Sequence, residues 1–158
     1  KTNIMKKIKL LIAMLTIVAI AKGGSITLNK DTIYTWQEFV SAVIMVESTN
    51  NPKAYNKREN AVGILQIRPI MVREVNRVLK MNNSNDRYTL LDRWSKEKSI
   101  DMFEIMAENV RCCEDMTRLE FYERVARKWN GGYRGMEKTA TIKYWNNIKK
   151  ELIKFGKQ

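Results

Sequence analysis

Residues 35–48 of the chain read TWQEFVSAVIMVES, and this stretch predicts an amphipathic helix with a carboxylate near its end. Thr35, with Glu38 three residues later, forms a capping box, which marks the start of a helix. The Asn-Asn-Pro sequence at residues 50–52 stops the helix. Between these limits, apolar residues recur at helical spacing: Trp36, Val40, Val43 and Ile44. The stretch therefore predicts a helix with one apolar face.

Glu47 lies on this apolar face of the predicted helix. Burial penalises the charged form of a carboxyl group and raises its pKa, which is what a general acid needs near neutral pH. The alternative is an exposed carboxylate at a helix end, which is the commoner situation for a glutamate. The helix alone leaves both interpretations open, and the motifs further along the chain favour the first.

The remaining apolar patterns also indicate helices, with polar loops between them. Residues 61–67 favour a short extended piece or a turn, and no internal repeat or strand-rich region is present. The chain is therefore predicted to be a mainly α protein with a single domain. The further helices predicted are residues 69–80, opened by Pro69; one capped by Ser99; one opened by a capping box of Thr117 and Glu120 and ended by Gly131 and Gly132; and residues 137–152.

Histidine is absent from the 158 residues, which carry a formal net charge of +12. Its absence excludes Ser-His-Asp and Cys-His catalysis and histidine-ligated metal sites, so an acid–base enzyme must use Glu, Asp, Tyr or Lys. We expect neither a metal nor a cofactor. The positive charge favours a polyanionic partner, such as nucleic acid, an anionic membrane or an anionic cell wall, although a basic surface without a specific partner has the same charge.

The beginning of the chain predicts an export signal. A short basic stretch precedes the apolar run of residues 10–21, which ends in Ala19-Ile20-Ala21, the small-x-small form of a signal peptidase site. The run is shorter than the ~20 residues of a membrane span, although an uncleaved anchor is the alternative. We therefore expect export to the periplasm, the cell envelope or the extracellular space. The predicted segments are a signal peptide or N-terminal anchor at 1–21, a linker at 22–33 and the folded domain at 34–158.

Cys112 and Cys113 are adjacent in the sequence. Adjacent cysteines rarely form a disulfide with each other, because the ring that they close is strained. No histidine is available to activate either thiol. We expect one of them to be buried as a small apolar residue, and we assign neither a catalytic role.

Three motifs after Glu47 carry residue types that suit a sugar ligand. Gly63-Ile64-Leu65-Gln66 combines a glycine, which lets the backbone approach a ligand, with an amide that both donates and accepts hydrogen bonds. Trp129-Asn130-Gly131-Gly132 offers an aromatic platform, an amide and a flexible turn, and Tyr144 lies in the last predicted helix. Taken singly, each has a plain structural alternative: an ordinary turn, a helix C-terminus and a core aromatic.

Together with Glu47-Ser48, these motifs resemble in order and spacing the motifs of the soluble lytic transglycosylase (SLT domain) and goose-type lysozyme family. The family pattern is Glu-Ser, Gly-Leu-Met-Gln, Ala-Tyr-Asn-x-Gly and then a Tyr, and the resemblance extends over residues 36–152. Lys128 and Trp129 replace the Ala and Tyr of the third motif, a change that concerns sugar contacts and specificity. The resemblance implies a lysozyme-like fold, with helices around a glycan-binding cleft and a small extended region.

By this resemblance, Glu47 is the catalytic residue of a peptidoglycan lytic transglycosylase. It protonates the β-1,4 glycosidic oxygen between N-acetylmuramic acid and N-acetylglucosamine, then deprotonates the C6 hydroxyl of the muramoyl sugar to give a 1,6-anhydro end. The N-acetyl group of the substrate replaces the usual second carboxylate. The substrate-binding residues implied are Ser48 and Gln66, which hold the sugar; Asn130, which orients its N-acetyl group; Tyr144, which hydrogen-bonds Glu47; and Gly63 and Trp129.

Two alternatives share this fold. If Glu59 or Asp92 faced Glu47 across the cleft, it could activate water, and the enzyme would be a hydrolytic muramidase. Glu59, however, has the surroundings of a solvated loop residue. The other alternative is a non-catalytic cell-wall-binding module. We expect peptidoglycan glycan strands as the partner, with transient contact to the membrane or a cell-envelope assembly, and no nucleic acid, because no nucleic-acid-binding motif is present.

Overall fold

The computed structural model describes residues 34–110 and 115–156, and within them the predicted mainly α fold is confirmed. The predicted signal peptide or anchor, the linker and both cysteines lie outside the described residues. None of the helices in the described part is long and apolar enough to cross a membrane. The α-helices are α2 (Trp36–Ser48), α3 (Pro69–Met81), α4 (Lys96–Glu108), α5 (Arg118–Gly131) and α6 (Thr139–Phe155), with the short 3-10 turns η1 (Asp92–Trp94) and η2 (Gly135–Glu137).

Helices α2 and α5 begin where the two capping boxes predict. The Thr35 side chain accepts a hydrogen bond from the backbone N–H of Glu38, whose carboxylate accepts from the N–H of Thr35 at 2.6 Å. Thr117 and Glu120 repeat the arrangement at the start of α5. Each box pairs N–H groups that a helix start otherwise leaves free, and a capping side chain is worth about 1 kcal/mol. Local sequence therefore fixes where both helices begin.

Helix α4 begins earlier than predicted. Its cap is Ser95, whose hydroxyl accepts a hydrogen bond from the N–H of Lys98 at 3.3 Å, and the prediction that Ser99 is the cap is wrong. Ser99 is fully buried within the helix and donates to the carbonyl oxygen of Arg93 at 3.0 Å. A serine hydroxyl can cap a helix or bond back to a nearby carbonyl, so tertiary packing decides between the two serines.

A two-stranded antiparallel hairpin follows α2 and consists of β1 (Tyr55–Asn56) and β2 (Ala61–Val62). Strand β2 is the extended piece predicted within residues 61–67. Val62 also forms an antiparallel bridge with Ile67, through hydrogen bonds of 3.3 and 3.0 Å. Residues 62–67 therefore form a loop that is closed at its base, and we call it the Gln66 loop.

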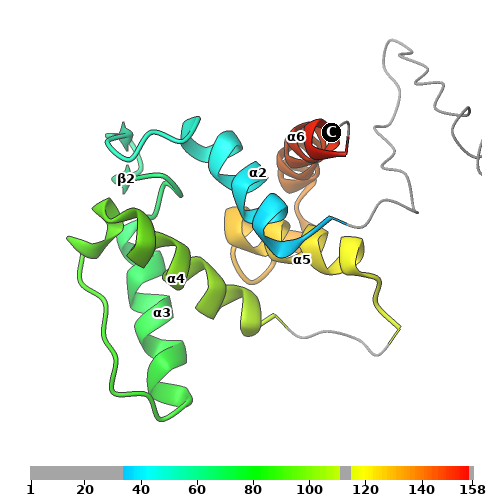
Figure 1. Ribbon diagram of the computed structural model, residues 1–158. Helices are drawn as coiled ribbons and strands as arrows, with labels where there is room; N and C mark the ends of the chain where they lie inside the picture. Colours follow the sequence, from blue (N-terminus) through cyan, green and yellow to red (C-terminus); the bar gives the residue numbers. More distant parts are fainter. Residues whose placement is uncertain (1–33, 111–114, 157–158) are drawn as a thin grey trace, which may run out of the picture.

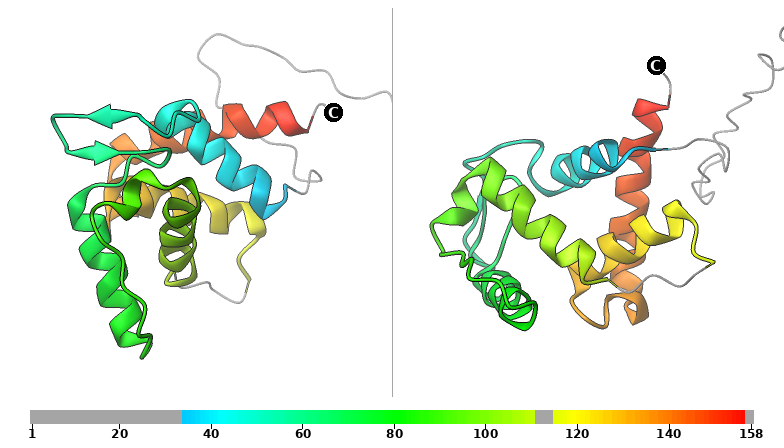
Figure 2. Two further views of the ribbon diagram at one scale, coloured as in Figure 1. Left: turned by 60° about the vertical axis from the view of Figure 1, so that its left-hand side comes forward. Right: turned by 60° about the horizontal axis from the view of Figure 1, so that its bottom comes forward.

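The core is a set of apolar and aromatic side chains from α2, α3, α4, α5, α6 and the Gln66 loop. Phe39 of α2 stacks on Tyr122 of α5 with ring centroids 4.3 Å apart, and Phe103 of α4 meets Trp129 of α5 edge-on at 4.9 Å. Such aromatic pairs contribute about 0.5–1.5 kcal/mol each beyond their burial. In Figures 1 and 2, the hairpin and α3 form one end of the molecule, and the C-terminal part of α6 lies at the opposite end.

Candidate active site

A cleft lies where the C-terminal ends of α2 and α5 meet the hairpin and the start of α3. Four of the predicted site residues line it, whereas Ser48, Gly63 and Tyr144 do not. The fold thus brings together residues from widely separated parts of the sequence. The lining residues are Glu47, Asn56, Glu59, Ala61, Gln66, Ile67, Arg68, Met71, Trp129 and Asn130.

Glu47 is held by two donors from the later helices. Tyr144 Oη of α6 donates to Glu47 Oε1 at 2.6 Å, the contact that the resemblance implied, and the indole N–H of Trp129 donates to the same carboxylate. Burial raises the pKa of Glu47 from 4.5 to about 7. The two hydrogen bonds and the charge of Arg68 lower this pKa, and the charge of Glu59 adds to the rise. Glu47 therefore exchanges its proton near neutral pH, as a general acid–base must.

Trp129 differs from the open aromatic platform that we expected. It is only 7% exposed, so its ring offers little of its face to a sugar. The ring packs edge-on against Phe103, and the N–H is directed to Glu47. Because an indole N–H donates and never accepts, this contact favours the charged form of the carboxylate. Trp129 thus lowers the pKa of the acid and forms part of the cleft wall.

Gln66 presents its amide from the Gln66 loop. Its Nε2 donates to the carbonyl oxygens of Ala54 at 3.2 Å and Gly63 at 3.0 Å. Within the described part of the chain, its Oε1 accepts no hydrogen bond, so this oxygen remains for a sugar hydroxyl or N–H group. The backbone of Gln66 has φ 46°, a costly conformation for a non-glycine residue that persists only where surrounding contacts impose it. The bridge at the base of the loop provides those contacts.

Gly63, within the Gln66 loop, and Ser48, on α2, fix the position of this loop without lining the cleft. At Gly63 (φ 76°), an added Cβ would lie 2.2 Å from the carbonyl oxygen of Arg93. The close approach that this glycine permits is therefore to η1, where we expected a ligand. Ser48 Oγ donates to the carbonyl oxygen of Ile64 at 2.8 Å, where we expected a contact with the sugar. Both residues join the loop to neighbouring elements and thereby position Gln66.

Arg93 is a buried residue that the motifs do not reveal, and it clamps the same wall of the cleft. It is 5% exposed. Its Nη1 donates to the carbonyl oxygens of Asn60 at 2.8 Å and Ile67 at 3.0 Å, and its Nε donates to Leu90 at 2.9 Å. One guanidinium therefore holds both ends of the segment 60–67. Because its acceptors are backbone carbonyls, no side-chain pattern in the sequence signals this role.

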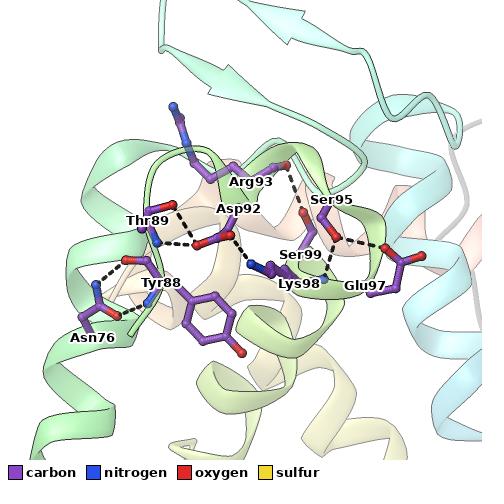
Figure 3. Close-up of polar contacts among 9 residues, drawn as sticks. All are labelled: Asn76, Tyr88, Thr89, Asp92, Arg93, Ser95, Glu97, Lys98 and Ser99. Atoms are coloured by element: carbon purple, nitrogen blue, oxygen red, sulfur yellow. Dashed lines mark hydrogen bonds and ion pairs between the residues drawn. The ribbon is translucent and has the colours of Figure 1, made fainter. Parts of the chain in front are cut away.

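Asp92 is one of the two candidates for a second carboxylate, but its side chain binds neighbouring residues outside the cleft. Its carboxylate accepts hydrogen bonds from the N–H and the hydroxyl of Thr89 and pairs with Lys98 (Figure 3). The hydrogen bond from Lys98 is the main cause that lowers the pKa of Asp92 to about 2, and the bond from Thr89 is the next. Asp92 does not line the cleft. It anchors η1, from which the Arg93 side chain extends toward the hairpin (Figure 3).

Glu59, the other candidate, does line the cleft. Its side chain is 51% exposed, in agreement with the solvated loop residue that we expected, and its Oε2 lies 3.5 Å from Arg68 Nη1. The sequence gives no sign that the loop between β1 and β2, which carries Glu59, lies beside Glu47. Asn130, at the end of α5, is exposed and also lines the cleft.

Residues 26–102 match the family model described as Transglycosylase SLT domain. This region therefore belongs to the transglycosylase SLT domain family, and the prediction of a soluble lytic transglycosylase domain is confirmed. No curated protein and no solved structure matches the chain significantly. The matched region contains Glu47 and Gln66 but ends before Trp129, Asn130 and Tyr144, which the fold brings to the same carboxylate and cleft. The family supports cleavage of peptidoglycan glycan strands as the class of activity.

Proposed function

We propose that the protein is a peptidoglycan lytic transglycosylase with Glu47 as its single acid and base. It cleaves the β-1,4 bond between N-acetylmuramic acid and N-acetylglucosamine and leaves a 1,6-anhydro-muramoyl end. The observation that carries the proposal is the carboxyl group of Glu47, which lines a cleft, has a pKa of about 7 and is contacted by Tyr144 and Trp129. The SLT domain supports the same class of reaction.

In the first step, the protonated Glu47 donates its proton to the glycosidic oxygen, and the bond from this oxygen to the anomeric carbon breaks. A pKa of about 7 leaves a large share of the carboxyl groups protonated at neutral pH, whereas an ordinary glutamate would be almost fully charged. The carboxylate that forms is stabilised by the hydrogen bonds from Tyr144 and Trp129. The substrate N-acetyl group shares the positive charge at the anomeric carbon.

In the second step, the same carboxylate acts as a base. It takes the proton of the C6 hydroxyl of the muramoyl sugar while this oxygen forms a bond to the anomeric carbon of the same sugar. The ring closes without water, and Glu47 regains the proton that it lost. One carboxyl group is enough because, with a pKa near neutral pH, it can first donate a proton and then accept one.

Two further residues have proposed roles in binding the strand. Gln66 uses its Oε1, the free atom of its amide, to accept a hydrogen bond from a sugar hydroxyl or N–H group. Asn130, which also lines the cleft, orients the N-acetyl group. We also propose that the protein is exported, because its substrate lies in the cell envelope and the first residues have the pattern of an export signal.

A hydrolytic muramidase is the second candidate, and Glu59 is the observation that favours it. This carboxylate lines the same cleft as Glu47 and would act as a base on water if it were free. It lies within 4 Å of Arg68, which offsets its charge. We therefore prefer the transglycosylase reaction, in which Glu59 takes no proton.

Mass spectrometry of the products distinguishes these reactions. The full chain is incubated with purified peptidoglycan, and the soluble fragments are compared with those from Glu47→Gln and from the matched surface variant Glu74→Gln. Anhydro-muramoyl ends, each lighter by one water and absent only with Glu47→Gln, are the expected result. Reducing ends would identify a hydrolase and overturn the proposed chemistry. Wall binding without any products would identify a non-catalytic module.

A further inference from the structure

Arg68 is a cation in the cleft wall that none of the four motifs requires. It directly precedes Pro69, the first residue of α3, and it lines the cleft together with Glu47 and Glu59. Its positive charge lies close enough to Glu47 to act on that carboxylate. A strand whose scissile bond is held over Glu47 therefore passes beside this guanidinium.

The Arg68 guanidinium is only weakly engaged within the protein. Its Nη1 lies 3.5 Å from Glu59 Oε2, and the two side chains are 38% and 51% exposed. This distance exceeds the ~2.7–2.9 Å of a charge-assisted hydrogen bond, and exposed ion pairs of this kind contribute little to stability. In segments 34–110 and 115–156, the side chain makes no hydrogen bond. Its planar fork of donors is therefore available to a ligand.

The substrate class proposed above carries a group that fits this fork. N-acetylmuramic acid differs from N-acetylglucosamine by a lactyl ether, which ends in a carboxylate or is joined through it to a stem peptide with carboxylates of its own. N-acetylglucosamine is neutral. Arginine binds a carboxylate through two parallel hydrogen bonds, a geometry that a lysine cannot reproduce. A guanidinium beside Glu47 can therefore distinguish the anionic muramoyl sugar from the neutral N-acetylglucosamine.

We propose that Arg68 binds a carboxylate of the muramoyl unit, and that this carboxylate displaces Glu59 from the guanidinium. This inference rests on the proposed function. In the free protein, Glu59 is the counter-ion of the guanidinium and competes with the ligand. The two residues therefore have opposite effects on the affinity for an anionic strand. Loss of Arg68 weakens binding, whereas loss of the Glu59 charge strengthens it.

Calorimetric titration of the full chain tests this exchange, with Glu47→Gln present in every variant to prevent turnover. The ligands are tetrasaccharides of alternating N-acetylglucosamine and N-acetylmuramic acid with free lactyl carboxylates, with amidated lactyl groups, or with stem peptides, and chitotetraose as the neutral sugar. Arg68→Gln is expected to weaken binding of an anionic ligand about tenfold and to leave the amidated ligand and chitotetraose unchanged. Glu59→Gln is expected to tighten binding of the anionic ligand several-fold.

Two further variants separate charge from geometry. Arg68→Lys keeps the charge but loses the fork, so an intermediate loss is expected. Arg73→Gln, an exposed position on α3 and outside the cleft lining, makes the same change of net charge and is expected to have no effect. An effect with the free lactyl ligand identifies the lactyl carboxylate as the bound group. An effect confined to the peptide-bearing ligand identifies the stem peptide.

The neutral ligands distinguish failure of this inference from failure of the proposed function. If amidated or neutral sugars bind and Arg68→Gln weakens all ligands equally, or none, the exchange is refuted and the glycan cleft stands. If no ligand binds and the wild-type chain releases no products from peptidoglycan, the proposed function is refuted together with the exchange.

Discussion

Tyr144 Oη lies 2.6 Å from Glu47 Oε1, and this hydrogen bond joins α6 to α2 at the carboxyl group that we propose as the acid. Burial raises the pKa of Tyr144 well above 10, and the nearby Glu47 carboxylate adds to this rise. The Tyr144 O–H therefore keeps its proton and remains a donor. The bond stabilises the charged form of Glu47 and opposes the effect of burial. These opposing effects set the pKa of Glu47 near 7.

Tyr144→Phe is expected to raise the pKa of Glu47 above about 7, because a donor to the charged form is lost. The alkaline limb of the pH–activity profile should therefore move to higher pH. The maximal rate should fall about tenfold, because the carboxylate formed in the first step loses a hydrogen bond. Titration of the Glu47 carboxyl carbon by NMR and the pH dependence of glycan cleavage measure the two effects.

Tyr122→Phe is the matched control for this experiment. Tyr122 is also buried, and its hydroxyl donates to the carbonyl oxygen of Tyr34 at 3.2 Å, outside the cleft. This variant should lose some stability without moving the titration of Glu47. An equal shift in both tyrosine variants, or none in Tyr144→Phe, would argue against a direct effect of Tyr144 on the acid.

Glu47→Gln is expected to stabilise the fold at neutral and alkaline pH. The folded pKa of about 7 lies above the ordinary value of 4.5, so the folded state binds the proton more tightly than the unfolded chain. The free energy of unfolding of the wild type should therefore fall as the pH rises from about 4.5 to 7. Above that range this loss of stability has reached its full size. Urea unfolding should show the variant more stable by on the order of 2 kcal/mol at pH 8. An unchanged difference between pH 4 and pH 8 would contradict the raised pKa.

Gly63→Ala is expected to destabilise the protein by roughly 3 kcal/mol or more, because it adds a steric clash to the strain of a left-handed backbone. The added Cβ would lie 2.2 Å from the carbonyl oxygen of Arg93. Gly132 also has a positive φ of 75°, but a Cβ there would have no atom within 4 Å. Gly132→Ala should therefore cost only the backbone strain, roughly 1–3 kcal/mol. Equal losses in thermal or urea unfolding would show that contact with η1 is not what requires the glycine.

Local patterns predicted the helices best. The boxes of Thr35 with Glu38 and Thr117 with Glu120 depend on residues three apart, so the sequence alone fixes the starts of α2 and α5. The choice between Ser95 and Ser99 could not be made in this way. It depends on a contact of Ser99 with Arg93 that exists only in the folded protein.

The candidate site shows the same division between local and long-range information. The motifs led to Glu47, Gln66 and Asn130, which line the cleft. They could not show that the close approach of Gly63 is to Arg93, because a glycine pattern does not name its partner. The Arg93 clamp has backbone acceptors 26 and 33 residues away, so no spacing of side chains predicts it.

The rate of glycan release from purified peptidoglycan, measured for wild type, Glu47→Gln and Glu59→Gln, tests most directly whether one carboxyl group performs the reaction. Glu47→Gln should release no anhydro-muramoyl products at any pH while remaining folded, and Glu59→Gln should still release them. Retention of most activity by Glu47→Gln, or an equal loss in both variants, would contradict the assignment of Glu47 as the single acid and base.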